Sequence, residues 1–295
     1  MTFNAIDLSK LPGPDIVETL SAENELQSLK DDLIASYPAI ADALNLESEP
    51  MVKFLELVAY RITLLKARVN TASLGVMIAH ATGNDLDNLA AVVPLERKVL
   101  AAGNADAIPP IDPTYETDDE FRARITLAPY AFSVAGPAGA YKFHALSAHS
   151  DVKDVAVDQP SPGVVRVTIL SRVGNGIPTQ AVLDAVTSLL TNDDVRPLGD
   201  SVQVQAATVA SYDVTATLTV LPGPDSEVVR QAALAALQDY ADATHAIGAT
   251  VTLAGITASL FQAGVQNVTL TSPVADIVAA ATEAPYLGTP TVTVG

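Results

Sequence analysis

The residues able to do chemistry are few in this chain of 295 residues, which has four His and no Cys. Without Cys there is no thiol nucleophile, no disulfide and no Cys-ligated zinc site. His144 and His149 are five residues apart, which places them on different faces of a helix, and no HExxH pattern provides a zinc pair. His80 and His245 fall near predicted helix ends, where His caps a final turn. We therefore expect structural roles for the histidines and no metal or cofactor.

Paired carboxylates are the next candidates for chemistry. Neighbouring residues point apart in a helix or turn, so pairs such as Asp31-Asp32 more often cap or solubilise than share a proton. A carboxylate-dependent hydrolase remains an alternative reading, and it would use the carboxylates around Asp118-Asp119 or Asp193-Asp194. Its mark would be a concave pocket holding a carboxyl group of raised pKa.

The sequence contains neither a complete phosphate-binding loop nor the nucleophile motif of an α/β-hydrolase. Gly174-Asn175-Gly176 lies between a predicted strand and a predicted helix, as a phosphate loop would. It lacks the third glycine of GxGxxG and the Gly-Lys-Ser/Thr of a P-loop, and Pro178 follows where phosphate-binding N–H groups would be needed. A turn is the better interpretation. No G-x-S-x-G elbow supplies the nucleophile of an α/β-hydrolase. We therefore expect no catalytic or cofactor-binding residues and no small-molecule substrate.

The net charge of the chain limits the classes of partner that it can bind. Lys and Arg number 16 against 34 Asp and Glu, a net charge of −18, and from residue 174 onward there are two basic and eleven acidic residues. Nucleic acid and anionic membrane surfaces need a positive footprint, so we expect neither as a partner. We also expect no signal peptide, because the first residues lack a basic region. The uncharged window between Asp242 and Asp276 alternates like strands, which argues against a membrane span.

The first hundred residues predict helices. The segment from Asp15 to Tyr37 is acidic and amphipathic, and Pro38 should end it. Pro50 suits the first turn of a second helix. We expect that helix to continue to about Ala81 and to stop at Thr82-Gly83-Asn84, a C-cap signal.

The second helix carries an apolar seam with 3-4-3-4 spacing about two heptads long. The seam consists of Leu55, Val58, Ile62, Leu65 and Val69. We interpret these as bundle-forming positions, so replacing Ile62 and Leu65 by Asp should abolish association with a partner. The same helix carries the basic residues Lys53, Arg61, Lys66 and Arg68. They form either a solvated face that balances neighbouring acids or a docking face for an acidic partner helix.

The composition changes after residue 100. Ala101–Pro113 is rich in Ala, Gly and Pro and predicts a linker or edge segment. Thr117 to Glu120 forms a capping box that opens a short helix through Ile125. We predict an α+β protein with a helical region over residues 1–100, a first α/β module with a Pro-rich leading segment over 101–206, and a second α/β module over 207–295.

The α/β half contains an internal repeat. Residues 196–204 match residues 245–253 at an offset of 49. A predicted strand and helix precede each copy, at 164–170 and 179–191 for the first and at 214–221 and 226–244 for the second. A helix–strand pair also recurs, at 138–148 with 152–157 and at 256–263 with 265–270. We interpret these as two related small α/β sandwiches, each a sheet with helices on one face.

An ordered set of motifs resembles the baseplate J-like family of contractile-tailed phages. In chain order the motifs are Asp7-Leu8, Leu11–Asp15, Asn45–Lys53, Ala59–Arg61, Arg68–Asn70, Ala81–Asp87, Ser133–Tyr141, Ser161–Gly163, Leu170–Arg172, Asp194–Pro197, Tyr212, Leu221–Pro224 and Ala275–Val278. The likeness runs to about residue 282, and the departures lie in Ala101–Pro113 and in the last dozen residues.

The resemblance implies a structural wedge component of a tail baseplate that joins wedges into an inner ring. It implies N-terminal helices that bundle with a baseplate I-type chain, and C-terminal modules that contact copies of the same protein and hub or tube-proximal proteins. It implies no enzymatic activity, and a place in the virion tail after assembly in the host cytoplasm. A trimeric receptor-binding adhesin is a further alternative, although such proteins tend to be rich in β repeats and exposed aromatics, whereas this chain has long predicted helices and no Trp.

Overall fold

The computed structural model describes residues 8–14, 16, 18–133, 135–223 and 225–295. The parts of the predicted motifs on Asp7, Asp15, Val134 and Pro224 lie outside these residues, as does the start of the helix expected from Asp15. The chain divides into two compact units, one made of residues 1–97 and 117–125 and the other of residues 98–116 and 126–295. The sequence order of helices followed by small mixed sheets confirms the predicted α+β class.

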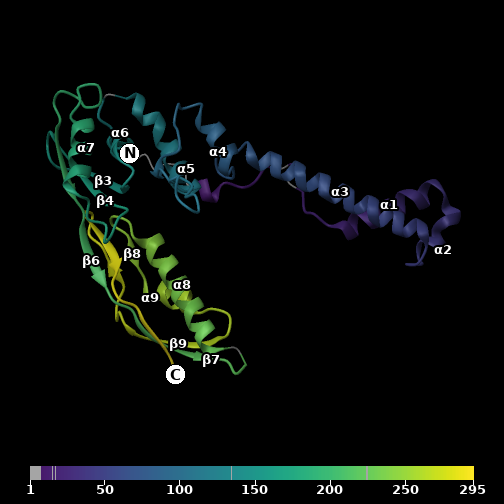
Figure 1. Ribbon diagram of the computed structural model, residues 1–295. Helices are drawn as coiled ribbons and strands as arrows, with labels where there is room; N and C mark the ends of the chain where they lie inside the picture. The colour runs from purple at the N-terminus through teal and green to yellow at the C-terminus, as the bar shows by residue number, and fades with distance from the viewer. Residues whose placement is uncertain (1–7, 15, 17, 134, 224) are drawn as a thin grey trace. The chain divides into compact units, whose positions relative to one another are not determined.

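The first unit begins with two helices packed side by side. Its first elements are η1 (Leu8–Lys10), α1 (Ala22–Ser36), η2 (Pro38–Ile40), α2 (Ala41–Leu44) and α3 (Pro50–Gly75). In Figure 1, α1 lies along α3. Leu44, Val52 and Leu55 form the buried centre of this contact. Leucines of α1 at positions 26, 29 and 33 recur every three or four residues, which gives α1 one apolar side for α3.

The proline signals for helix ends are confirmed, and two other boundaries are corrected. Helix α1 ends before Pro38, and α3 starts at Pro50. Residues 18–20 are not helical, because Ser21 provides the N-cap by accepting the N–H of Asn24. Helix α3 ends at Gly75 and does not reach Ala81. At Gly75 the backbone passes so close to Asp85 that a Cβ would come within 2.8 Å of its carboxylate oxygen.

The rest of the first unit is a small helical cluster. Helix α4 (Gly83–Ala90) starts at Gly83, the glycine expected to end α3, and Gly83 has φ +53°. Helix α5 (Asp118–Leu127) opens with the predicted capping box: Thr117 N–H donates to Glu120 Oε2 at 3.1 Å and Glu120 N–H donates to Thr117 Oγ1 at 3.3 Å. The cluster is centred on Phe121, which is fully buried.

The Pro-rich segment expected as a linker or edge is a β-hairpin of the second unit. Its strands are β1 (Val99–Ala101) and β2 (Thr114–Tyr115), which pair antiparallel. Asn104 and Ile111 continue the pairing with two backbone hydrogen bonds of 2.7 and 2.9 Å. Gly103 has φ +70° and lies so close to the opposite strand that a Cβ would meet the Ile111 carbonyl at 2.5 Å. The turn therefore depends on glycine.

The central part of the second unit is a three-stranded sheet with helices. Its elements are η3 (Ala128–Phe132), α6 (Ala138–Ala148), β3 (Val152–Ser161), β4 (Val164–Ser171), α7 (Gln180–Leu190) and β5 (Ser201–Ala206). Strand β4 is the middle strand, antiparallel to β3 and parallel to β5. Alternate residues of β4 such as Val167 and Ile169 pack against α6 and α7 in one buried core.

The C-terminal part has a second sheet of the same kind. Its elements are β6 (Thr208–Tyr212), β7 (Thr215–Val220), α8 (Ser226–Thr244), β8 (Thr250–Val251), α9 (Leu253–Leu260), β9 (Val265–Ser272), β10 (Ile277–Val278), β11 (Glu283–Leu287) and β12 (Thr291–Val294). Strand β7 is the middle strand, antiparallel to β9 and parallel to β12. Its residues Ala216 and Leu218, with Val214 just before it, pack in one core with α8 and α9, and its threonines face outward.

The two predicted repeat copies agree in the middle strand of each sheet, β4 and β7, but differ in the segment that pairs parallel to it. In each sheet the middle strand has one antiparallel and one parallel neighbour. The offset of 49 aligns β5 with residues 250–255, but β8 covers only Thr250–Val251 and pairs with β10, and Leu253 already starts α9. The parallel place beside β7 is taken by β12, from the C-terminus of the chain. The second module is therefore completed by a distant segment.

Candidate interaction surfaces

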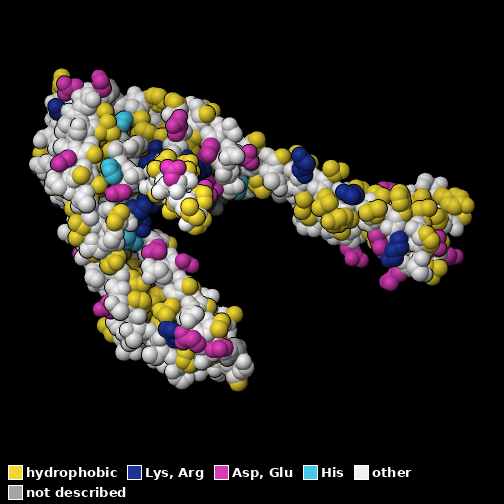
Figure 2. Space-filling model, in the orientation of Figure 1, with side chains coloured by type: hydrophobic (Ala, Val, Ile, Leu, Met, Phe, Trp, Pro, Cys, Tyr) yellow, Lys and Arg dark blue, Asp and Glu magenta, His cyan; other side chains and the backbone are white. Residues whose placement is uncertain are grey.

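The outward face of α3 is covered with exposed apolar side chains. Phe54, Leu57 and Leu65 are 60%, 55% and 65% exposed. The whole set on the helix, which we call the α3 outer face, is Met51, Phe54, Leu57, Tyr60, Leu64, Leu65 and Val69. A helix that is apolar on nearly all sides is normally buried on nearly all sides. Figure 2 shows yellow side chains along the α1–α3 pair with dark blue groups among them.

The predicted seam divides between two environments. Leu55 is buried, at 8% exposure, in the contact with α1. Its expected role in binding a partner is therefore corrected to a role in the core of this chain. Val58 and Ile62 are half-buried, whereas Leu65 and Val69 are exposed. The residues between the seam positions, such as Leu57 and Leu64, were missed because a single seam was expected. The signal was present, since apolar residues occur on every side of this helix.

The basic residues of α3 also differ from one another. Lys66 reaches across to α1 and the preceding segment, with Nζ 2.8 Å from Glu18 and 2.6 Å from Glu25, and these hydrogen bonds raise the pKa of Lys66 to about 12. Lys53 pairs with Glu56 at 2.8 Å on the same helix. Arg61 and Arg68 are exposed, and within the described part of the chain neither has an acidic partner.

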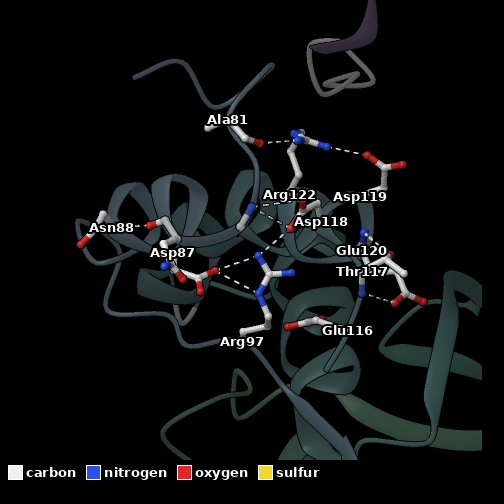
Figure 3. Close-up of polar contacts among 12 residues, drawn as sticks. Ala81, Asp87, Asn88, Arg97, Glu116, Thr117, Asp118, Asp119, Glu120 and Arg122 are labelled. Atoms are coloured by element: carbon white, nitrogen blue, oxygen red, sulfur yellow. Dashed lines mark hydrogen bonds and ion pairs between the residues drawn. The ribbon is translucent and has the colours of Figure 1, made fainter. Parts of the chain in front are cut away.

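Arg97 is the centre of a polar cluster in the first unit (Figure 3). Its Nη2 lies 2.8 Å from Asp87 Oδ1 and 2.7 Å from Asp118 Oδ1. Its guanidinium also stacks over the Phe121 ring, 4.9 Å from the centroid. Partial burial would raise the pKa of Asp118, but hydrogen bonds from Arg97 and Gly83 N–H outweigh it and hold that pKa below its usual range. The cluster joins α4, α5 and the chain between them.

Three of the four carboxylates considered for catalysis, Asp118, Asp119 and Asp193, are engaged in ion pairs. Asp119 contacts Arg122, whose guanidinium also donates to the carbonyls of Ile78 and Ala81 at 2.7 Å each. Asp193 lies 3.4 Å from Arg196. Asp194 accepts no hydrogen bond in the described structure, and its N–H donates to Asn192 Oδ1. The pairs are thus held at helix starts and turns.

A cavity of about 380 Å³ lies beside the start of α6. Its carboxylates are Asp158 and Asp200. A hydrogen bond from Arg166 lowers the pKa of Asp158. Tyr141 donates its hydroxyl to Asp200 at 2.7 Å, and burial together with this bond raises the pKa of Tyr141. Both carboxylates therefore act as hydrogen-bond acceptors.

His149 and His245 each lie at the end of a helix, as predicted for His245. His149 is the C-cap of α6, and its Nδ1 accepts the N–H of Asp151 at 3.1 Å. His245 is the C-cap of α8; its Nδ1 lies 2.6 Å from the Pro285 carbonyl of β11, and its ring meets Tyr286 edge-on. Burial lowers the pKa of His144 and of His245.

Hydrogen bonds join β3 of the central sheet to the C-terminal part near His245. Ile247 N–H donates to Asp154 Oδ2 at 3.0 Å, and Lys153 Nζ donates to the Asp242 carbonyl at 3.0 Å. Ile247 further packs against a small buried cluster of Leu170, Ala207 and Ala284.

No group of three or more potential metal ligands comes together over the described residues. In the same part of the chain, no helix combines the length and apolar content needed to cross a bilayer.

Comparison with known proteins decides the family. Three family models match in order: the baseplate J-like N-terminal domain over residues 47–104, the central domain over 133–206 and the C-terminal domain over 212–293. The chain is also 43% identical over 286 residues to baseplate protein J of Escherichia phage P2, covering 95% of both chains. The chain belongs to the baseplate J-like family.

One solved structure is similar over part of its length. A chain in the six-fold symmetrised baseplate of the anti-feeding prophage matches with a TM-score of 0.44 and 14% identity, over 60% of this chain and 44% of that one.

The three domains matched by the family models coincide with the elements described above. The N-terminal match holds α3 and α4, the central match the sheet of β4, and the C-terminal match the sheet of β7. As a member of the family, the chain is a structural protein of a phage-type tail baseplate.

Proposed function

We propose that this baseplate J-like protein is a wedge component that links wedges into the inner ring of a contractile-tail baseplate. In this proposal the helical region of residues 1–100 bundles with other wedge proteins, including a baseplate I-type chain. The modules over 101–206 and 207–295 contact copies of the protein in neighbouring positions and hub or tube-proximal proteins. The protein works in the virion tail after assembly in the host cytoplasm.

The α3 outer face is the observation that carries this proposal. Phe54, Leu57 and Leu65 are each more than half exposed on one helix, although α1 already covers the opposite side. Burying such side chains against a partner would remove large apolar areas from water, at roughly 25 cal/mol for each Å². A short apolar helix face of this kind is typical of a segment completed by partner helices.

The proposal includes no enzymatic activity. Catalysis by a general acid needs a carboxyl group of raised pKa in a pocket. The resolved shifts in carboxyl pKa are downward, for Asp118, Asp158 and Glu227, and each comes with hydrogen bonds from an arginine. Their arginine partners favour the ionised form of these carboxyl groups, which makes them poor general acids.

Protein content of purified tails tests the wedge role. Quantitative mass spectrometry with negative-stain imaging should find this chain in copies divisible by six, and should lose it from particles that lack baseplates. Absence from the particle, or three copies at a fibre tip, would overturn the proposal in favour of the hydrolase or adhesin reading.

Substitutions on the α3 outer face test how the protein is incorporated. Leu57→Asp together with Leu64→Asp should prevent incorporation into tails while the isolated chain keeps its helical content by circular dichroism. Val92→Asp is the matched control, because Val92 is 84% exposed and lies outside α3. Normal tails from the double variant would show that this face is not used in assembly.

A further inference from the structure

We propose that the α3 outer face binds an acidic amphipathic helix of another protein, and that Arg61 and Arg68 pair with its carboxylates. This inference rests on the proposed function, in which α3 binds partners, and adds the chemistry of the partner.

The two arginines are placed within the apolar face. They are seven residues apart, which puts them on the same side of α3 and about 10.5 Å apart along its axis. On one flank, Leu57 lies four residues before Arg61, and Leu64 lies four residues before Arg68. On the other flank, Leu65 lies four residues after Arg61 and three before Arg68. A helix that covers these leucines must therefore also cover both guanidiniums.

The other cations of α3 are already neutralised. Lys66 is held by Glu18 and Glu25, and Lys53 by Glu56. Arg61 and Arg68 have no such pairing among the residues that the structure describes. Covering a charged guanidinium without an acceptor is costly, because the group loses water and gains nothing in exchange. Carboxylates of the partner supply the acceptors, and the planar guanidinium suits paired hydrogen bonds to a carboxylate.

A second copy of this chain is a poor occupant of the face. The exposed side of another α3 would bring Arg61 and Arg68 against like charges, and the one acidic residue of α3, Glu56, is paired with Lys53. Helix α1 is acidic, but its leucines 26, 29 and 33 already pack against its own α3. Neither helix of a second copy offers both an apolar stripe and free carboxylates.

Two designed peptides test the charge requirement. Both are helical with the same leucine heptads, and they differ only in having Glu or Lys at the positions flanking the leucines. Fluorescence anisotropy with the full chain should show binding of the Glu peptide at least about tenfold tighter than that of the Lys peptide. The variant Arg61→Glu/Arg68→Glu should reverse this preference. Equal binding of both peptides, binding of neither, or an unchanged preference in the variant would overturn the inference.

Three further measurements separate the outcomes. Lys30→Glu, a single charge reversal on α1, should leave the preference for the Glu peptide unchanged. Sedimentation should show a monomer, and a dimer abolished by Arg61→Glu/Arg68→Glu would assign the face to a second copy and overturn the inference. If Leu57→Asp/Leu64→Asp is lost from tails but Arg61→Glu/Arg68→Glu is still incorporated, the inference of an acidic partner is wrong and the proposed function stands. If both variants are still incorporated, the proposed function is wrong.

Discussion

Gly176 lies directly against the ring of His245, so that a Cβ on Gly176 would come within 2.7 Å of His245 Nε2. Gly176 ends the Gly174-Asn175-Gly176 turn of the central sheet, and His245 follows α8 in the C-terminal part. The turn that could have been a phosphate loop thus packs against the C-cap residue of α8. Its second glycine meets two demands: it has φ +95°, and it leaves room for the imidazole.

Gly176→Ala should destabilise the second unit more than Gly174→Ala. Both glycines have positive φ, at +95° and +65°, so each substitution adds backbone strain. A Cβ on Gly174 meets nothing within 4 Å, whereas one on Gly176 meets His245 and Leu170. We expect Gly176→Ala to cost about 1–3 kcal/mol and Gly174→Ala less, measured by thermal unfolding. Equal losses in the two variants would mean that the contact with His245 is unimportant.

Leu55→Ala and Leu65→Ala should have opposite effects on stability and assembly. Leu55 is 8% exposed against α1, and its truncation leaves a cavity that costs about 2–4 kcal/mol. Leu65 is 65% exposed, so its truncation should leave the free energy of unfolding of the isolated chain nearly unchanged and weaken incorporation into tails. Denaturant unfolding and tail composition measure the two effects. A large loss of stability from Leu65→Ala would contradict the assignment of Leu65 to a partner-binding face.

Arg97→Gln should destabilise the first unit. The substitution removes the cation between Asp87 and Asp118 and the group stacked on Phe121, at a cost of about 1–3 kcal/mol. Arg230→Gln is the control, since Arg230 pairs with Glu227 on the surface of α8 and should matter little. Circular dichroism at 222 nm during heating compares the variants. Similar melting curves for the two variants would argue against a structural role of the Arg97 cluster.

The contribution of Asp118 should disappear in acid. Its folded pKa lies below the ordinary Asp value of about 3.9. The unfolded chain therefore binds a proton first as the pH falls, and the stability that Asp118 contributes is complete above the unfolded pKa and lost as the pH passes through the folded one. The melting temperatures of the wild type and Asp118→Asn should thus converge between about pH 5 and pH 2. A constant difference over that range would refute the role of the charge.

Local signals predicted many elements of the fold correctly. The helices over 138–148 and 226–244 agree with α6 and α8, and Pro50 marks the start of α3. Capping residues, proline and apolar spacing act within a few residues, so they can be read from a single segment. The end of α3 at Gly75 was not predicted, because Thr82-Gly83-Asn84 resembles a C-cap signal although Gly83 opens α4.

The candidate surface was predicted in part. The sequence indicated α3 as the bundling helix and Leu65 and Val69 as positions on its binding side, and both are exposed. It also indicated Leu55, which instead packs against α1. The seam pattern is the same in both cases, so spacing alone cannot tell an internal partner from an external one. Arg97 gave no signal, because the carboxylates it joins are ten and twenty-one residues away.

By itself the sequence determined the α+β class, the family and the amount of apolar surface on α3, since these depend on residue types and their local order. Tertiary structure decided which part of the apolar surface of α3 stays exposed. Because α1 has one apolar side, it covers only one side of α3 and leaves Phe54, Leu57 and Leu65 in solvent. It likewise decided that β12, and not the repeat copy at 250–253, completes the sheet of β7. Strand pairing is a contact between segments distant in the chain, and its choice depends on the packing of the whole module.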